Sequence, residues 1–227
     1  MSLVLVDFKD LEKIRRLNSL GSGKEGRIYE QLDTKQLIKL YHSLDGKRKV
    51  YFDDLVCSNI SFPKDILMFS NYVAGYTMDY LGGEKIRNGF SKDLEIQTLK
   101  KMYLEIYKII QNYPDIYMDD LCLANILVDN LNERINLIDT SRWYLKTNSS
   151  KENLLWLDRC LIYALCQQTL DWENDNQEKS SELVKLYCLY KLGKPVSFLE
   201  ILEAVWFEIE EKSGVKVKTL GDLTLLR

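Results

Sequence analysis

Short apolar runs alternate with polar turns over the first eighty residues, a pattern typical of β-strands. The expected strands lie at 27–31, 36–41, 66–69 and 72–80, with turns at 32–34 and 70–71. A short lead-in helix is expected over 7–14, and a longer one over 47–59 ends before Phe62-Pro63. This part of the chain is therefore expected to form a small sheet with few helices.

Helical spacing of the apolar residues dominates after Gly82-Gly83. The expected helices lie at 94–111, at 153–168 (apolar nearly all round and so expected to be buried), at 180–192, and from a capping box at Ser197 and Glu200 to near Gly214, with a solvated loop over 173–179. The sequence thus predicts an α+β fold with a boundary between 1–81, mainly strands, and 82–227, mainly helices.

A polar turn at 129–133 separates two short apolar runs, 126–128 and 135–138, which predicts a β-hairpin. Asn125 precedes the first strand and Asp139 follows the second, so the hairpin should bring their side chains close together. Oxygen ligands of this kind suit Mg²⁺, which keeps waters and substrate phosphates in the rest of its shell. Asp120, in the entering loop, can face the same point. The alternative interpretation of these residues is an ordinary surface hairpin with acidic ends.

Three glycines, Gly21, Gly23 and Gly26, follow Leu20 in a G-x-G-x-x-G pattern. A dinucleotide-binding fold needs a helix directly after such glycines. Strand–turn–strand follows here instead, which favours a glycine-rich hairpin laid over phosphates. Lys39 shares a strand face with Leu37 and Tyr41, so it either reaches phosphate oxygens beneath the loop or is an ordinary solvated strand lysine.

Composition narrows the class of protein. The chain has 227 residues, a net charge of -3 and no long basic block, so nucleic acid is not an expected partner. Five cysteines without CxxC spacing and a single histidine, His42, argue against a structural zinc site and a disulfide framework, which favours a reducing cytoplasm. No apolar run is long enough for a membrane span, so no membrane partner is expected.

The order of these motifs resembles that of the protein-kinase-like superfamily over residues 20–168. It comprises the glycine-rich loop, Lys39, a helix, Met78-Asp79-Tyr80-Leu81-Gly82-Gly83, Asp120-x-x-x-x-Asn125 and Asp139. The resemblance implies a bilobal fold, with an N-lobe over 1–81, a C-lobe over 82–227 and ATP between them.

Residue roles follow from the resemblance. Asp120 corresponds to the catalytic aspartate that orients and deprotonates the acceptor hydroxyl, Asn125 and Asp139 to the Mg²⁺ ligands, and Lys39 to the lysine on the α/β-phosphates. The acidic partner of Lys39 would be Asp53 or Asp54, and the distance to Phe62-Pro63 favours Asp53. The expected nucleotide-binding residues are Leu20, Gly21, Gly23, Gly26, Ile28, Leu37, Lys39, Asp53, Met78 as gatekeeper, and Asp79, Tyr80 and Leu81 as the hinge.

Several positions depart from the family pattern. The catalytic motif reads Met118-Asp119-Asp120, Cys122 replaces a lysine, and Asp139-Thr140-Ser141 replaces Asp-Phe-Gly. No Ala-Pro-Glu follows, so neither a peptide-binding platform nor control by phosphorylation is expected.

The expected function is ATP- and Mg²⁺-dependent transfer of a phosphoryl group to a hydroxyl, on a protein Ser or Thr. The alternatives are a small-molecule kinase of the aminoglycoside or choline type, and a pseudokinase that serves as a nucleotide-binding or interaction module.

Overall fold

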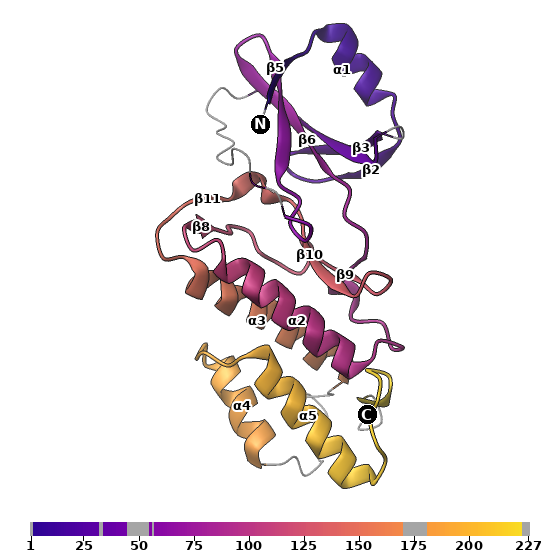
Figure 1. Ribbon diagram of the computed structural model, residues 1–227, viewed down its shortest axis with the longest axis vertical. Helices are drawn as coiled ribbons and strands as arrows, with labels where there is room; N and C mark the ends of the chain where they lie inside the picture. The colour runs from indigo at the N-terminus through magenta and orange to yellow at the C-terminus, as the bar shows by residue number, and fades with distance from the viewer. Residues whose placement is uncertain (1, 32–33, 45–54, 56, 170–180, 224–227) are drawn as a thin grey trace. The chain divides into compact units, whose positions relative to one another are not determined.

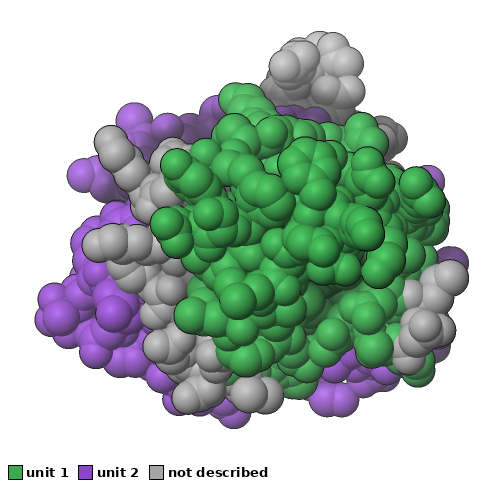
Figure 2. All heavy atoms as spheres, turned by 90° about the horizontal axis from the view of Figure 1, so that it is seen from above, with its two compact units in different colours: residues 1–81, 138–143 green, residues 82–137, 144–227 purple. Residues whose placement is uncertain are grey.

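A computed structural model describes residues 2–31, 34–44, 55, 57–169 and 181–223 (Figure 1). The chain divides into two units, coloured separately in Figure 2. Unit 1 comprises Met1–Leu81 and Ile138–Trp143, and unit 2 comprises Gly82–Leu137 and Tyr144–Arg227. Residues 138–143 were expected in the helical part of the chain, whereas this short segment belongs to the unit that contains the large sheet.

Unit 1 is built on a six-stranded sheet in the order β1-β5-β6-β4-β3-β2. Its strands are β1 (Ser2–Leu5), β2 (Ser19–Ser22), β3 (Gly26–Gln31), β4 (Gln36–Tyr41), β5 (Pro63–Phe69) and β6 (Tyr72–Asp79). β1 runs parallel to β5, and the other pairs are antiparallel. The strand β1 was not predicted, because four exposed residues at the chain's beginning carry no alternating pattern.

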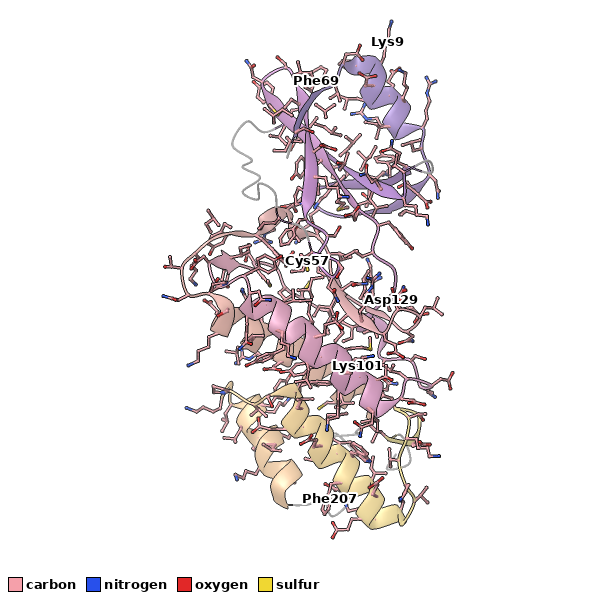
Figure 3. All side chains as sticks on the ribbon, in the orientation of Figure 1. Lys9, Cys57, Phe69, Lys101, Asp129 and Phe207 are labelled. Carbon is pink, nitrogen blue, oxygen red and sulfur yellow. The ribbon has the colours of Figure 1, made fainter. Side chains whose placement is uncertain are left out.

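One face of this sheet is covered by α1 (Phe8–Arg15), which begins at an Asp7 capping box. Leu11 of α1 packs with buried side chains from β3, β4, β5 and β6, namely Tyr29, Ile38, Leu40, Leu67 and Ala74. At the edge of this contact the ring of Phe69, labelled in Figure 3, meets that of Phe8 edge-to-face at a centroid distance of 5.6 Å. The period of two therefore turns the alternate residues of β4, including Lys39, toward the other face.

The helix predicted over 47–59 falls mostly outside the described residues. Its described C-terminal end is not helical, because Ser58 and Asn59 form a turn. The strand that follows begins at Pro63, three residues earlier than predicted, since its first residues pair with the end of β6. The turn predicted over 32–34 and the loop predicted over 173–179 also lie wholly or partly outside the described residues.

The predicted hairpin is present in unit 2 as β9 (Ile126–Asp129) and β10 (Arg134–Leu137), paired from Arg134↔Asp129 to Leu137↔Ile126. Its third strand is β7 (Glu84–Lys85), followed by the 3-10 turn η1 (Ile86–Asn88). A second small sheet pairs β8 (Ile116–Tyr117) with β11 (Tyr144–Leu145). The strand β8 thus fixes the start of the loop that carries Asp120.

Four helices form the rest of unit 2: α2 (Ile96–Gln111), α3 (Ser150–Thr169), α4 (Ser181–Lys191) and α5 (Phe198–Ser213). Helix α3 is largely buried, as its apolar sequence predicts, with Leu157, Leu161, Ile162 and Leu165 fully enclosed, but Trp156 and Tyr163 are exposed. The capping box at Ser197 and Glu200 starts α5, and Gly214 ends it in the left-handed conformation. With five α-helices and a multi-stranded sheet among the described residues, the fold is mixed α+β.

Among the helices that the structure describes, none combines the length and apolar character needed to cross a membrane.

Candidate functional site

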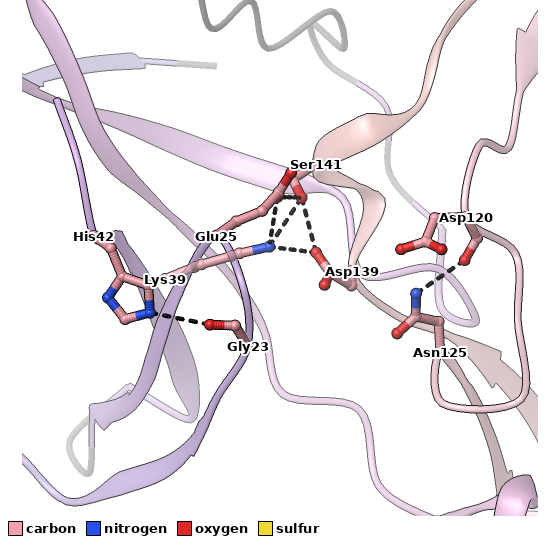
Figure 4. Close-up of polar contacts among 8 residues, drawn as sticks. All are labelled: Gly23, Glu25, Lys39, His42, Asp120, Asn125, Asp139 and Ser141. Carbon is pink, nitrogen blue, oxygen red and sulfur yellow. Dashed lines mark hydrogen bonds and ion pairs between the residues drawn. The ribbon is translucent and has the colours of Figure 1, made fainter. Parts of the chain in front are cut away.

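The site in unit 1 is organised around Lys39 in the middle of β4. Lys39 is only 3% exposed, so it is not an ordinary solvated lysine on a strand. The ammonium group forms an ion pair and hydrogen bond with Asp139 and lies 3.6 Å from a carboxylate oxygen of Glu25 (Figure 4). Two residues a hundred positions apart in sequence, Lys39 and Asp139, are therefore brought together within one unit.

Asp139 reaches this position through an unusual backbone conformation. It lies in the left-handed region (φ 59°, ψ 55°) and precedes the 3-10 turn η2 (Thr140–Arg142). The segment 138–143 contacts the rest of unit 1 at two points. The Thr140 hydroxyl donates to the Ser61 carbonyl at 3.0 Å, and the Trp143 ring packs edge-to-face on Phe62 at a centroid distance of 5.9 Å. Non-glycine residues held in this region often mark functional sites, and aspartate tolerates it better than most.

Ser141 links the three charged groups. Its hydroxyl accepts a hydrogen bond from Lys39 Nζ at 2.9 Å. The same hydroxyl can donate to either carboxylate, because Oγ lies 2.8 Å from Asp139 Oδ1 and 3.2 Å from Glu25 Oε2. The cluster thus holds two carboxylates and one ammonium, so a net negative charge remains.

Two tyrosines line the buried side of the cluster. Lys39 Nζ lies about 6 Å from the ring centroids of Tyr41 and Tyr76, within reach of a cation–π interaction. Burial, and then the negative charge of Asp139, raise the pKa of the Tyr76 hydroxyl well above its ordinary value, an effect that Ser141 partly offsets. Within the described residues this enclosed hydroxyl makes no hydrogen bond of standard geometry. An enclosed polar group without such a bond is uncommon in folded proteins.

The apolar residues predicted to line the nucleotide site gather on the same sheet face. Strand register pairs Ile28 with Lys39 and Leu37 with Met78. These three apolar side chains pack with Tyr41 and Tyr76, Met78 being buried and the other two partly exposed. The sheet thus presents an apolar surface beside a buried ammonium group.

The glycine-rich loop joins β2 to β3, which pair from Ser19↔Tyr29 to Ser22↔Arg27. Gly26 is required by packing, because a Cβ there would lie 2.2 Å from the Leu40 carbonyl oxygen. Gly21 and Gly23 are different: a Cβ at either position would meet nothing within 4 Å of the described chain. Packing within the protein does not require these two glycines, whereas a closely approaching ligand would. Leu20, before them, is half exposed.

Two of the three predicted hinge residues already use backbone groups within unit 1. The Asp79 carbonyl accepts from the Ser61 hydroxyl at 2.9 Å, and the Tyr80 N–H donates to the Lys35 carbonyl at 3.3 Å. The Asp79 carboxylate pairs with Lys64 at 2.6 Å. Leu81, the third, is partly buried at the end of unit 1.

Unit 2 carries Asp120 and Asn125 on the loop between β8 and β9. Asp120 has a left-handed backbone (φ 65°), as Asp139 has. The Asn125 amide donates to the Asp120 carbonyl at 2.9 Å, so the loop closes on itself (Figure 4). Asn125 belongs to unit 2 and Asp139 to unit 1, so their predicted common metal site stays a prediction.

Asn153, in the first turn of α3, holds the backbone that leads into the loop between β8 and β9. Its amide accepts from the Met118 N–H at 2.9 Å and donates to the Ile116 carbonyl at 2.7 Å, which satisfies the backbone just before Asp120. No role was predicted for Asn153 from the sequence. A polar residue at the beginning of a helix that is apolar nearly all round was the available signal.

Metal ligation rests on few groups. Within the part of the chain that the structure describes, no three or more His, Cys, Asp or Glu side chains are grouped so as to hold a metal ion. Asp139, the predicted Mg²⁺ ligand in unit 1, would therefore need waters or substrate oxygens to complete a shell, as Mg²⁺ commonly does. Asp53 and Asp54, the predicted partners of Lys39, lie outside the described residues. Glu25 and Ser141 were not foreseen as partners.

A scan against protein-family models and a search of curated proteins found no match to this chain.

Proposed function

We propose that this protein is an ATP- and Mg²⁺-dependent phosphotransferase. The observation that carries the proposal is the buried Lys39–Asp139 pair beside two glycines, Gly21 and Gly23, that packing does not require. A buried lysine that neutralises carboxylates is a cation that can equally neutralise phosphate oxygens. The apolar face formed by Ile28, Leu37 and Met78 is suited to a base.

Each residue of the chain would have the role that the resemblance to protein kinases implies. Lys39 would neutralise phosphate oxygens, and Asp139 and Asn125 would hold the metal ion. Asp120 would orient the acceptor hydroxyl and take its proton. Magnesium, when bound, supplies charge neutralisation for the phosphates; catalysis in this class is mostly positioning and electrostatic stabilisation.

A hydroxyl of a protein Ser or Thr is the acceptor proposed first. A small-molecule alcohol is the second candidate, and a specific observation favours it. Helix α3 begins at Ser150, so only a short segment follows Asp139, and it contains η2 and β11. That leaves little chain to build a platform for an extended peptide.

Nucleotide binding is tested first. Millimolar Mg²⁺–ATP should raise the melting temperature of the wild type, because a ligand that binds only the native state stabilises it. Lys39→Met removes the ammonium and keeps the apolar stem, so it should abolish the shift. Lys9→Met, on the exposed surface of α1, should keep it. An equal shift in all three proteins would remove Lys39 from the site.

Transfer is tested separately with γ-labelled ATP and Asp120→Asn. Asparagine tolerates the left-handed backbone and removes only the charge, so nucleotide binding should survive while transfer falls by orders of magnitude. The acceptors to compare are the protein itself, a general protein substrate and a panel of small alcohols. If the wild type binds ATP but labels none of them and hydrolyses no ATP, the protein is a nucleotide-binding module without transfer activity.

A further inference from the structure

Glu25 lies inside the glycine-rich loop, between Gly23 and Gly26, and its side chain turns inward. One carboxylate oxygen is 3.6 Å from Lys39 Nζ and 3.2 Å from Ser141 Oγ (Figure 4). The side chain is 37% exposed, whereas that of Lys39 is 4% exposed. A loop residue thus contributes a negative charge to the buried ammonium group of the site.

The loop backbone holds Glu25 in this position. The Glu25 carbonyl accepts from the His42 N–H at 2.9 Å, and the Gly23 N–H donates to the Gly26 carbonyl at 2.9 Å. The His42 ring nitrogen Nε2 lies 3.0 Å from the Gly23 carbonyl oxygen. Because His42 directly follows β4, the strand that bears Lys39, loop and lysine are fastened to the same piece of backbone.

The charges conflict with phosphate binding. A triphosphate on Lys39 would add several negative charges beside Glu25 and Asp139. The proposed function gives Asp139 a metal ion to bind, but it gives Glu25 no cation other than Lys39. The Glu25 carboxylate and a phosphate therefore compete for one ammonium group.

We propose that Glu25 is an internal competitor of the phosphates: its carboxylate occupies part of the anion position of Lys39 and holds the glycine-rich loop against Ser141. Release of Glu25 then accompanies nucleotide binding and lowers the apparent affinity. The inference rests on the proposed function, because it takes Lys39 as the phosphate-binding group.

The first arm of the test measures affinity by calorimetric titration with Mg²⁺–ATP. Glu25→Gln keeps the shape of the side chain and removes its charge, so it should bind about two- to fivefold tighter, the range of a partly exposed ion pair. The gain should shrink at high salt, because screening weakens the competition. Glu12→Gln makes the same charge change on α1, on the opposite sheet face, and should bind like the wild type.

The second arm needs no nucleotide. Amide hydrogen exchange over residues 20–26 should be faster in Glu25→Gln than in the wild type, because the loop loses its contact with Lys39 and Ser141. Exchange in Glu12→Gln should be unchanged. The proposal that Glu25 competes with phosphates is contradicted if amide exchange in Glu25→Gln is unchanged, or if Glu25→Gln binds Mg²⁺–ATP no more tightly than the wild type. If neither the wild type nor Glu25→Gln binds Mg²⁺–ATP, the proposed function itself has failed.

Discussion

At the scale of single residues, two buried charged side chains are stabilised in opposite ways. Lys39 is surrounded by opposite charges, those of Asp139 and Glu25. Asp158, on α3, is buried and forms no ion pair with the residues that the structure describes: its carboxylate accepts from the Tyr103 hydroxyl at 2.7 Å and the Phe198 N–H at 3.0 Å. Burial outweighs these hydrogen bonds and raises the pKa of Asp158 above its ordinary 3.8. The first charge suits a ligand site, and the second is structural.

The raised pKa of Asp158 predicts a pH effect on stability. The folded protein binds this proton more readily than the unfolded chain, so the contribution of Asp158 is fully present below pH 3.8 and is lost as the pH rises through the folded pKa. The stability of the wild type relative to Asp158→Asn should therefore fall as pH rises above about 4. Urea unfolding of both proteins across the pH range measures it.

Asp222 provides a control of opposite sign. Backbone hydrogen bonds from Thr219 and Lys218 lower the pKa of its carboxyl, so stability relative to Asp222→Asn should rise with pH through the acidic range. If the stability of the wild type relative to Asp158→Asn does not change with pH, or rises with pH, then burial does not raise the pKa of Asp158.

At the scale of elements, the β2–β3 hairpin contains glycines that serve two purposes. Gly26 lets β3 approach β4 closely, whereas a Cβ at Gly21 or Gly23 would meet nothing within 4 Å in the described part of the chain. A glycine motif read from sequence treats the three alike. Their surroundings separate the one needed for folding from the two available to a ligand.

Alanine substitutions should separate these two purposes. Gly26→Ala should lose about 1–3 kcal/mol of unfolding free energy, because its Cβ would clash with the Leu40 carbonyl. Gly21→Ala and Gly23→Ala should stay within about 0.5 kcal/mol of the wild type but bind Mg²⁺–ATP more weakly. Urea unfolding and calorimetric titration provide the two readouts. Wild-type nucleotide affinity in both of the last variants would show that the loop does not contact phosphates.

At the scale of the whole molecule, the chain leaves unit 1 after Leu81 and returns to it only for Ile138–Trp143. That short return supplies Asp139 and Ser141 to the site. It is held by Thr140 and by Trp143, which is 2% exposed and packs against Phe62. The site of unit 1 therefore depends on a segment that a division of the sequence at residue 81 would remove.

Trp143→Ala should test how strongly this segment is held. The loss of a buried tryptophan should cost about 3–5 kcal/mol of unfolding free energy, and Lys39-dependent nucleotide binding should weaken with it. Trp156→Ala is the matched control, because Trp156 is 43% exposed and its loss should cost far less. Equal destabilisation by the two substitutions in urea unfolding would show that Trp143 does not anchor the segment.

The sequence by itself determined the local elements. Alternation located β3, β4 and β6, helical spacing located α2, a nearly continuous apolar stretch located α3, and the capping box at Ser197 located the start of α5. These patterns succeed because each is a property of neighbouring residues and of one buried face. Strand β1 escaped prediction because an exposed strand at the sheet edge has no such face.

Only the tertiary structure decided the partners of Lys39. Its face was predictable from the period of two, but its neighbours come from two other segments of the chain, Glu25 from the glycine-rich loop and Asp139 and Ser141 from 138–143. The left-handed backbone at Asp120 and Asp139 likewise depends on the loops that hold them. Contacts between distant segments follow from chain topology and packing, which no local pattern encodes, and those contacts turn a strand lysine into a candidate phosphate-binding group.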